Sequence, residues 1–190
     1  MRIIGGQCRG RKLESFKGRD VRPTADRVRE SLFNILAHKT RDACVLDLFS
    51  GTGALGIEAL SRGARMAVFV DNSAHSINVL RKNLSRCALP GGCARVIQWD
   101  IARNLECLRP YRQSFNLVFL DPPYQGELAA VAMQHLLHCG CLAPEAVLVV
   151  EHEAHAMPEV KSDRFTCTDR RRYGRTGLTF FSLFSISQDA

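Results

Sequence analysis

The chain has 190 residues, of which 46% are hydrophobic and 24% charged, so one folded domain with a sizeable core is expected. No apolar run reaches the roughly 18 residues of a membrane span, and the N-terminus lacks the apolar centre of a secretory signal, which favours a cytoplasmic protein. The net charge of +7 is uneven: residues 1–41 carry +7, residues 42–160 carry −3 and residues 161–177 carry +4. Two basic ends around an acidic middle indicate a polyanionic partner, with an ordinary solvated surface as the alternative.

The first segment of the chain combines glycine with basic residues. The stretch IIGGQCRGRKLESF, residues 3–16, predicts a glycine-containing hairpin. It carries Arg9, Arg11 and Lys12, which we expect to contact RNA phosphates.

A helix is expected next, over about residues 25–37, because Pro23 opposes helix just upstream and Thr24 can cap the first turn. Three apolar residues recur along it at helical spacing: Val28, Leu32 and Ile35. Three arginines of the region are left for RNA phosphates or for the carboxylate of a cofactor: Arg22, Arg27 and Arg29. Alternatively, one of the last two pairs with Asp26 or Glu30 on the helix surface.

From residue 43 the chain alternates strand-like and helix-like segments. Four apolar runs each end in aspartate: ACVLD at Asp47, AVFVD at Asp71, RVIQWD at Asp100 and NLVFLD at Asp121. Their intervals of 24, 29 and 21 residues each accommodate a strand, a helix and a return. Helices are expected at residues 54–62, 74–86, about 101–108 and 127–138, with a fifth strand at 146–152. The alternation predicts an α/β fold, with a mostly parallel sheet and helices on both faces.

All four aspartates are expected at the carboxyl edge of this sheet, where such folds bind ligands near the point at which the strand order reverses. Singly, each aspartate can cap the following helix. Four carboxylates on one edge repel one another, however, so the edge is expected to bind a ligand with positive charge or several donors. A divalent metal ion is the less favoured alternative.

The turn after the first strand, DLFSGTGALG, is the expected cofactor loop. It contains a GxGxxG pattern, which by itself also fits a dinucleotide-binding oxidoreductase. Asp47 argues against a pyrophosphate and for a cationic ligand, and S-adenosylmethionine carries a sulfonium and an ammonium group but no phosphate. We expect Asp71 to accept the ribose hydroxyls and Asp100 the adenine amine. Loop residues expected beside the cofactor are Asp47, Phe49, Gly51 and Gly53.

The fourth strand ends in DPPY, residues 121–124, which predicts a rigid seat for a planar amine. Asp121 and the carbonyl of Pro122 can accept the two N–H bonds of an exocyclic nucleobase amine and aim its lone pair at a methyl group. Pro122 and Pro123 fix the backbone, and Tyr124 offers a stacking face. The structural alternative is a plain proline turn with the tyrosine in the core.

Basic residues return near the end of the chain. RRRYGRTG, residues 170–177, predicts a strand and a tight turn beside the site, and four arginines there are expected to meet RNA: Arg170, Arg171, Arg172 and Arg175. The eight cysteines form no CxxC pair, and the cluster around His135 and Cys139 lacks a second ligand pair, so no metal site is predicted.

Taken together, RIIGGQCRGRKL, RPTADRVRESLFNIL, DLFSGTGALGIEALSRGA, DPPY and RRYGRTGLTFF resemble the RsmD-type 16S rRNA guanine-N2 methyltransferases over nearly the whole chain. The resemblance implies a Rossmann-like methyltransferase fold with a small N-terminal β-hairpin. It also implies S-adenosylmethionine as cofactor and methylation of one guanine, G966 in the family, within the small ribosomal subunit or an assembly intermediate. Residues 1–41 would then be an RNA-facing extension and residues 42–190 the methyltransferase domain, acting as a monomer.

Three other functions remain open from the sequence. DPPY alone also suits an adenine-N6 or cytosine-N4 methyltransferase acting on DNA. A non-catalytic rRNA-binding assembly factor would use the same basic ends, but it would not need Asp121 or Tyr124. A dinucleotide oxidoreductase would need the glycine loop alone.

Overall fold

The computed structural model describes residues 1–16, 23–123, 127–156, 160 and 162–184. Its elements in chain order are α1 (Pro23–Ile35), α2 (Ala37–Thr40), β1 (Cys44–Leu48), α3 (Ala54–Ser61), β2 (Met66–Asp71), α4 (Ala74–Cys87), β3 (Ala94–Gln98), the 3₁₀ helix η1 (Glu106–Tyr111), β4 (Phe115–Leu120), α5 (Glu127–Cys139), β5 (Leu142–Glu153), β6 (Phe165–Tyr173) and β7 (Thr176–Leu183).

Seven strands form one sheet in the order β3-β2-β1-β4-β5-β7-β6. The first five strands of the chain are parallel, whereas β7 pairs antiparallel with both β5 and β6. The strand order reverses between β1 and β4, so the carboxyl ends of these two strands flank the place where ligands bind in such sheets. The predicted α/β class is confirmed.

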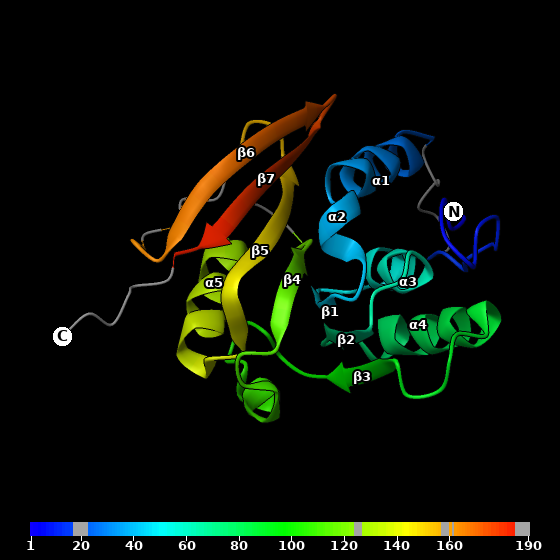
Figure 1. Ribbon diagram of the computed structural model, residues 1–190, viewed down its shortest axis with the longest axis horizontal. Helices are drawn as coiled ribbons and strands as arrows, with labels where there is room; N and C mark the ends of the chain where they lie inside the picture. Colours follow the sequence, from blue (N-terminus) through cyan, green and yellow to red (C-terminus); the bar gives the residue numbers. More distant parts are fainter. Residues whose placement is uncertain (17–22, 124–126, 157–159, 161, 185–190) are drawn as a thin grey trace.

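Helices cover both faces of the sheet (Figure 1). One core cluster packs α1, α3 and α4 against one face, with Phe33, Ile57 and Leu80 fully buried. The other packs η1 and α5 against the opposite face, around Leu108 and Met133. No helix in the described ranges is both long enough and apolar enough to cross a membrane.

The helix of the basic N-terminal region differs in detail from the prediction. It begins at Pro23 rather than near residue 25, since proline is well suited to a first helical turn, and Thr24 therefore lies inside the helix instead of capping it. Val28 and Leu32 are buried as expected, but Ile35 is 40% exposed, and Leu36 completes the apolar face in its place.

Of two other expectations, one is left unconfirmed and one needs correction. The regular N-terminal hairpin is not confirmed: Arg2 and Lys12 form one isolated antiparallel bridge. The helix expected at about residues 101–108 is replaced by a turn and by η1, which contains Pro110. In that turn the Trp99 indole donates to the carbonyl oxygen of Asn104 at 3.0 Å. Near the C-terminus, β6, a two-residue turn and β7 confirm the predicted strand and tight turn.

Candidate active site

Three of the four predicted aspartates lie at the carboxyl ends of β1, β2 and β4, around the reversal point of the sheet. Asp47 is the fourth residue of β1 and pairs in register with Phe119, two residues before Asp121. Asp71 is the last residue of β2. Since side chains two residues apart share a face of a strand, Asp47 and Asp121 project from the same face of the sheet. The predicted row of carboxylates is therefore present.

Asp47 is 2% exposed and is bonded to the protein rather than open to a ligand. Its Oδ2 accepts the amide of Gly56 at 2.9 Å, at the third position of α3. Gly53, which precedes that helix, has no side chain to do this, so a carboxylate from the neighbouring strand serves as the cap. Burial, followed by repulsion from Asp121 and Asp71, raises the pKa of Asp47 well above its usual range, against the bond from Gly56.

The backbone of the cofactor loop has positive φ angles, which glycine adopts more readily than other residues. Phe49, Gly51 and Gly53 all have positive φ angles, of 58°, 52° and 78°. A Cβ atom on Gly53 would overlap Leu80 Cδ1, and its φ of +78° would strain any other residue, so glycine is favoured there. For Phe49 this conformation costs about 1–2 kcal/mol, a strain that marks functional loops.

Asp71 holds this loop in place. Its Oδ2 accepts the amide of Gly51 at 2.8 Å, and its Oδ1 accepts the amide of Ser73 at 2.9 Å. Each carboxylate oxygen keeps a second lone pair, which leaves acceptors for two hydroxyl groups of a ligand. The side chain thus both shapes the loop and offers the acceptors that a ribose needs.

Asp100 follows β3 and is exposed. It lines an open depression at the sheet edge together with Asn72, Gln98, Trp99 and Arg103. Its Oδ1 already accepts the amide of Ala102 at 3.1 Å, which fixes its orientation. The half-buried Trp99 ring beside it supplies an apolar wall for a planar group.

The residues present fit a nucleoside cofactor with a positively charged tail. Ser50 Oγ is buried and has no hydrogen-bond partner among the described residues, so a polar atom is left to be satisfied in the loop. Acceptors dominate the edge, and no basic side chain lines the depression except Arg103. A pyrophosphate at this edge would be repelled by the carboxylates of Asp71 and Asp100, whereas a sulfonium or ammonium group would be attracted.

The residues Asp121, Pro122 and Pro123, called the clamp from here on, lie across the reversal point from the glycine loop. Asp121 and Pro123 are exposed and Pro122 is partly exposed, immediately beyond the last residue of β4. Asp121 acts electrostatically on both Asp47 and Glu151. Tyr124, the predicted stacking residue, lies outside the described residues.

A second acid beside the clamp was not predicted from the sequence. Glu151 lies near the carboxyl end of β5, and its pKa is raised to about 8, chiefly by burial and then by repulsion from Asp121. The available signal was its place after the apolar run AVLVV, because parallel strands end at one edge.

The N-terminal segment is hydrogen-bonded to the cofactor loop through Asn83. This contact was also not predicted from the sequence. Asn83, fully buried on α4, accepts the amide of Glu14 at 2.7 Å and donates to the carbonyl oxygens of Glu14 and Thr52 at 3.1 and 2.9 Å. Glu58, also fully buried, accepts the amides of Ile4 and Gly5, both at 2.8 Å. The segment therefore packs as part of the domain beside the site.

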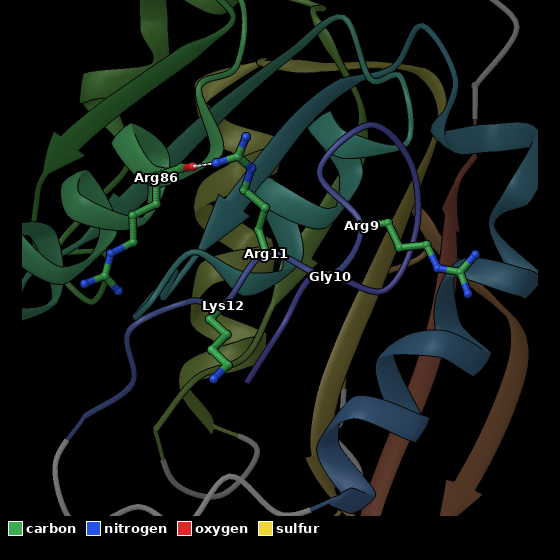
Figure 2. A pocket seen from close by; sticks show the side chains of 5 residues that line it. All are labelled: Arg9, Gly10, Arg11, Lys12 and Arg86. Atoms are coloured by element: carbon green, nitrogen blue, oxygen red, sulfur yellow. Dashed lines mark hydrogen bonds between the residues drawn. The ribbon is translucent and has the colours of Figure 1, made fainter.

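The predicted RNA-binding residues divide into two exposed groups. The first lines a shallow depression formed by Arg9, Gly10, Arg11, Lys12 and Arg86 (Figure 2). Figure 2 shows Arg11 turned toward α4, where its Nη1 donates to the carbonyl oxygen of Arg86 at 2.8 Å, while Arg9 points away. The second comprises four exposed arginines of the β6–β7 turn region: Arg170, Arg171, Arg172 and Arg175.

Of the three arginines expected around α1, Arg27 is exposed and Arg22 lies outside the described residues. Arg29 is 5% exposed and bonded within the protein, so it is not open to RNA. Its Nη2 donates to the carbonyl oxygen of Arg2 at 2.6 Å and forms a salt bridge with Asp26 at 3.0 Å. This corrects the expected role of Arg29 and confirms the alternative of a pair on the helix.

Comparison with known proteins gives a consistent family. The family model described as "Conserved hypothetical protein 95" matches residues 1–182. The chain is 42% identical to "Ribosomal RNA small subunit methyltransferase D" of Escherichia coli over 86% of this chain and 80% of the relative. It is 37% identical to the protein of the same name from Haemophilus influenzae, over 97% and 93% of the two chains.

The solved structure of yhhF from Escherichia coli has the same fold. It superposes with a TM-score of 0.82 at 38% identity, covering 96% of this chain and 97% of that one. The reversal point of the sheet, the glycine loop and the clamp all lie within residues 1–182, which the family model matches. The chain belongs to the RsmD family of S-adenosylmethionine-dependent small-subunit rRNA methyltransferases.

Proposed function

We propose that this protein methylates the N2 exocyclic amine of one guanine in 16S rRNA, at the position that the family counts as G966. The observation that carries the proposal is the placement of the clamp Asp121-Pro122-Pro123 directly across the sheet's reversal point from the glycine loop. This arrangement puts amine acceptors beside a site for a cationic nucleoside. The family relationship supports rRNA of the small subunit, folded or in assembly, as the substrate.

The cofactor, S-adenosylmethionine, supplies an electrophilic methyl group. Gly51 and Gly53 let the backbone approach it closely, and Phe49 lies in the same strained loop. Asp71 accepts the ribose hydroxyls with the lone pairs that the amides of Gly51 and Ser73 leave free. Asp100 would accept the adenine amine beside Trp99, and Asp47 holds the first turn of α3 behind the loop through the amide of Gly56.

The chain's own residues activate the substrate amine. Its lone pair is delocalised into the guanine ring, so the amine is a weak nucleophile. Asp121 and the carbonyl of Pro122 accept its two N–H bonds, which favours tetrahedral geometry at nitrogen and directs the lone pair at the methyl group. The methylated amine is acidic and loses its extra proton to Asp121 or to water, so no strong base is needed. Tyr124 stacks on the base and offsets part of the cost of exposing it.

The basic groups bind the RNA backbone. Residues 1–41 form the RNA-facing extension, with Arg9, Arg11, Lys12, Arg22 and Arg27 toward phosphates, and the β6–β7 turn adds its four arginines. Phosphate contacts fix register but carry little sequence information. Recognition of the target therefore comes from the shape of the folded rRNA. The protein acts as a monomer in the cytoplasm, where small subunits are assembled.

Transfer of labelled methyl from S-adenosylmethionine tests the proposal. The substrates are unmodified small subunits, protein-free 16S rRNA and DNA, each with wild-type protein and Asp121→Ala. N2-methylguanosine formed on the subunit and lost in the variant is the expected result. Label on DNA alone would replace the proposal by adenine or cytosine methylation, and tight subunit binding without any label would indicate an assembly factor.

A further inference from the structure

Glu151 occupies the position next to the clamp aspartate in the sheet. Strands β4 and β5 are parallel, and Leu120 pairs in register with Val150, so Asp121 and Glu151 are the next residues of the two neighbouring strands. Phe119 and Val149 precede them by two positions, and both pack in the same core cluster. Because side chains alternate along a strand, Asp121 and Glu151 project from the same face of the sheet as Phe119 and Val149, which places Glu151 beside the clamp.

The protein around Glu151 stabilises its carboxylate poorly, because burial and repulsion from Asp121 raise its pKa more than Arg29 lowers it. No hydrogen bond or salt bridge holds it among the residues that the structure describes. Three elements pack against it: β4 presents Asp121, α1 presents Arg29, and β7 presents the uncharged Leu178 in register. Arg29 is already bonded to Asp26 and to the carbonyl oxygen of Arg2. A partly buried acid beside a second acid destabilises the fold, which is the pattern of a group kept for a ligand.

The three bases that carry an exocyclic amine differ at the ring nitrogen beside it. In guanine the N2 amine lies between N1–H, a donor, and N3, an acceptor, so only the N1 side of the amine presents donors throughout. In adenine and cytosine the neighbouring ring nitrogen is an acceptor. A pair of carboxylates side by side therefore complements guanine and opposes the other two bases, whose acceptor would face an acceptor.

We propose that Glu151 accepts the N1–H of the substrate guanine while Asp121 and Pro122 hold its N2 amine, and that Glu151 thereby selects guanine over adenine and cytosine. This inference rests on the proposed guanine-N2 activity and adds a binding residue that determines base specificity. The proposal explains why the protein keeps a partly buried acid that lowers its stability: the carboxylate serves to recognise the base.

The protonation state of Glu151 makes the inference measurable. Its pKa of about 8 means that the group is neutral in the free protein at low pH and ionised at high pH. The ionised form accepts N1–H, whereas the neutral form donates a proton to an acceptor. 2-Aminopurine keeps the exocyclic amine but has an unprotonated N1 that accepts. Guanosine and 2-aminopurine at the target position should therefore respond to pH in opposite directions.

The test uses small subunits reconstituted with 16S rRNA that carries either base at the target position. Methyl transfer is measured as kcat/KM between about pH 6 and about pH 9, since this quantity reports ionisation in the free protein. For wild-type protein, kcat/KM with guanosine is expected to rise to a plateau above about pH 8, and with 2-aminopurine to fall over the same range. In Glu151→Gln both slopes disappear, and kcat/KM with guanosine at high pH drops about tenfold to a hundredfold.

Glu153→Gln is the matched control, since it removes the same charge from an exposed position on the same strand. It should keep both wild-type pH profiles. A melting curve shows whether Glu151→Gln remains folded, and Glu151→Asp, which keeps the acid, should retain a pH-dependent profile. If wild-type protein forms no N2-methylguanosine, the proposed function fails. If it does, but Glu151→Gln keeps the wild-type slopes and discrimination, the role of Glu151 alone is overturned.

Discussion

The two halves of the carboxyl edge use their acids differently. On the cofactor side, Asp47 and Asp71 accept three backbone amides between them, so they hold α3 and the glycine loop in place. On the substrate side, Asp121 is exposed at the end of β4, and Glu151 has a raised pKa and no bond within the described ranges. Acids of the first kind stabilise the shape of the site, and we propose that acids of the second kind accept hydrogen bonds from the substrate.

The strongest test of this comparison is Asp121→Asn. The amide keeps one acceptor oxygen but loses the charge that pulls on the amine, so we expect kcat to fall about 10²–10³-fold with little change in cofactor affinity or melting temperature. Methyl transfer to small subunits and calorimetric titration with S-adenosylmethionine measure the two effects. Asp163→Asn, an exposed acid far along the chain, is the control, and an equal loss of cofactor affinity in Asp121→Asn would contradict the division of roles.

Asp71→Ala should damage both the fold and cofactor binding. The change removes acceptors for the amides of Gly51 and Ser73, which should lower the free energy of unfolding by about 3 kcal/mol. Loss of the ribose acceptors should weaken S-adenosylmethionine about tenfold to a hundredfold. Denaturant melts and calorimetry give the two values.

Ser73→Ala serves as the control for that experiment. Ser73 Oγ caps α4 by accepting the amide of Ser76 at 3.2 Å, so its loss should cost about 1 kcal/mol of stability without affecting cofactor affinity. Unchanged cofactor affinity in Asp71→Ala would show that Asp71 is structural only.

Glu151→Gln should stabilise the protein, in contrast to the loss in Asp71→Ala. The pKa of Glu151 is raised from 4.5 to about 8, so the folded state binds this proton more tightly than the unfolded chain. Wild-type stability therefore falls as the pH rises through this window, whereas glutamine does not titrate. The variant should gain stability progressively over the window, on the order of 5 kcal/mol above pH 8. Urea melts across the pH range measure this gain. If the stability difference between the variant and the wild type does not change with pH, the carboxylate of Glu151 is not destabilised by its surroundings.

The strands, most helices and the aspartate row could be predicted because their signals are local. A run such as NLVFLD identifies its strand and its end within six residues, and the glycine loop favours glycine at Gly53 for reasons of backbone conformation. Those patterns needed no knowledge of distant neighbours.

The burial of Arg29 against Glu58 and the environment of Glu151 could not be predicted, since these neighbours are distant in the chain. Arg29 is buried between Asp26 and the fully buried Glu58, whose Oε2 lies 3.6 Å from its Nε. The raised pKa of Glu151 depends on Asp121, thirty positions earlier, and on burial that no local pattern reports. Tertiary packing decides whether a charged residue contacts a partner, a substrate or solvent.

The smallest expected effect is on RNA binding and concerns Lys12, which lies away from the carboxyl edge of the sheet. Lys12 is exposed in the N-terminal depression beside Arg9 and Arg11, and its amine forms no salt bridge with a described residue. Lys12→Gln should weaken subunit binding about threefold to tenfold and reduce the slope of log affinity against log salt by about one, because one phosphate contact and its released counterion are lost. Lys39→Gln, an exposed lysine on α2, is the control. Methyl transfer at saturating subunit concentration should stay at the wild-type rate, since a phosphate contact positions the RNA but does not touch the reacting amine. A lower rate at saturation would show that Lys12 contributes to the methyl-transfer step instead.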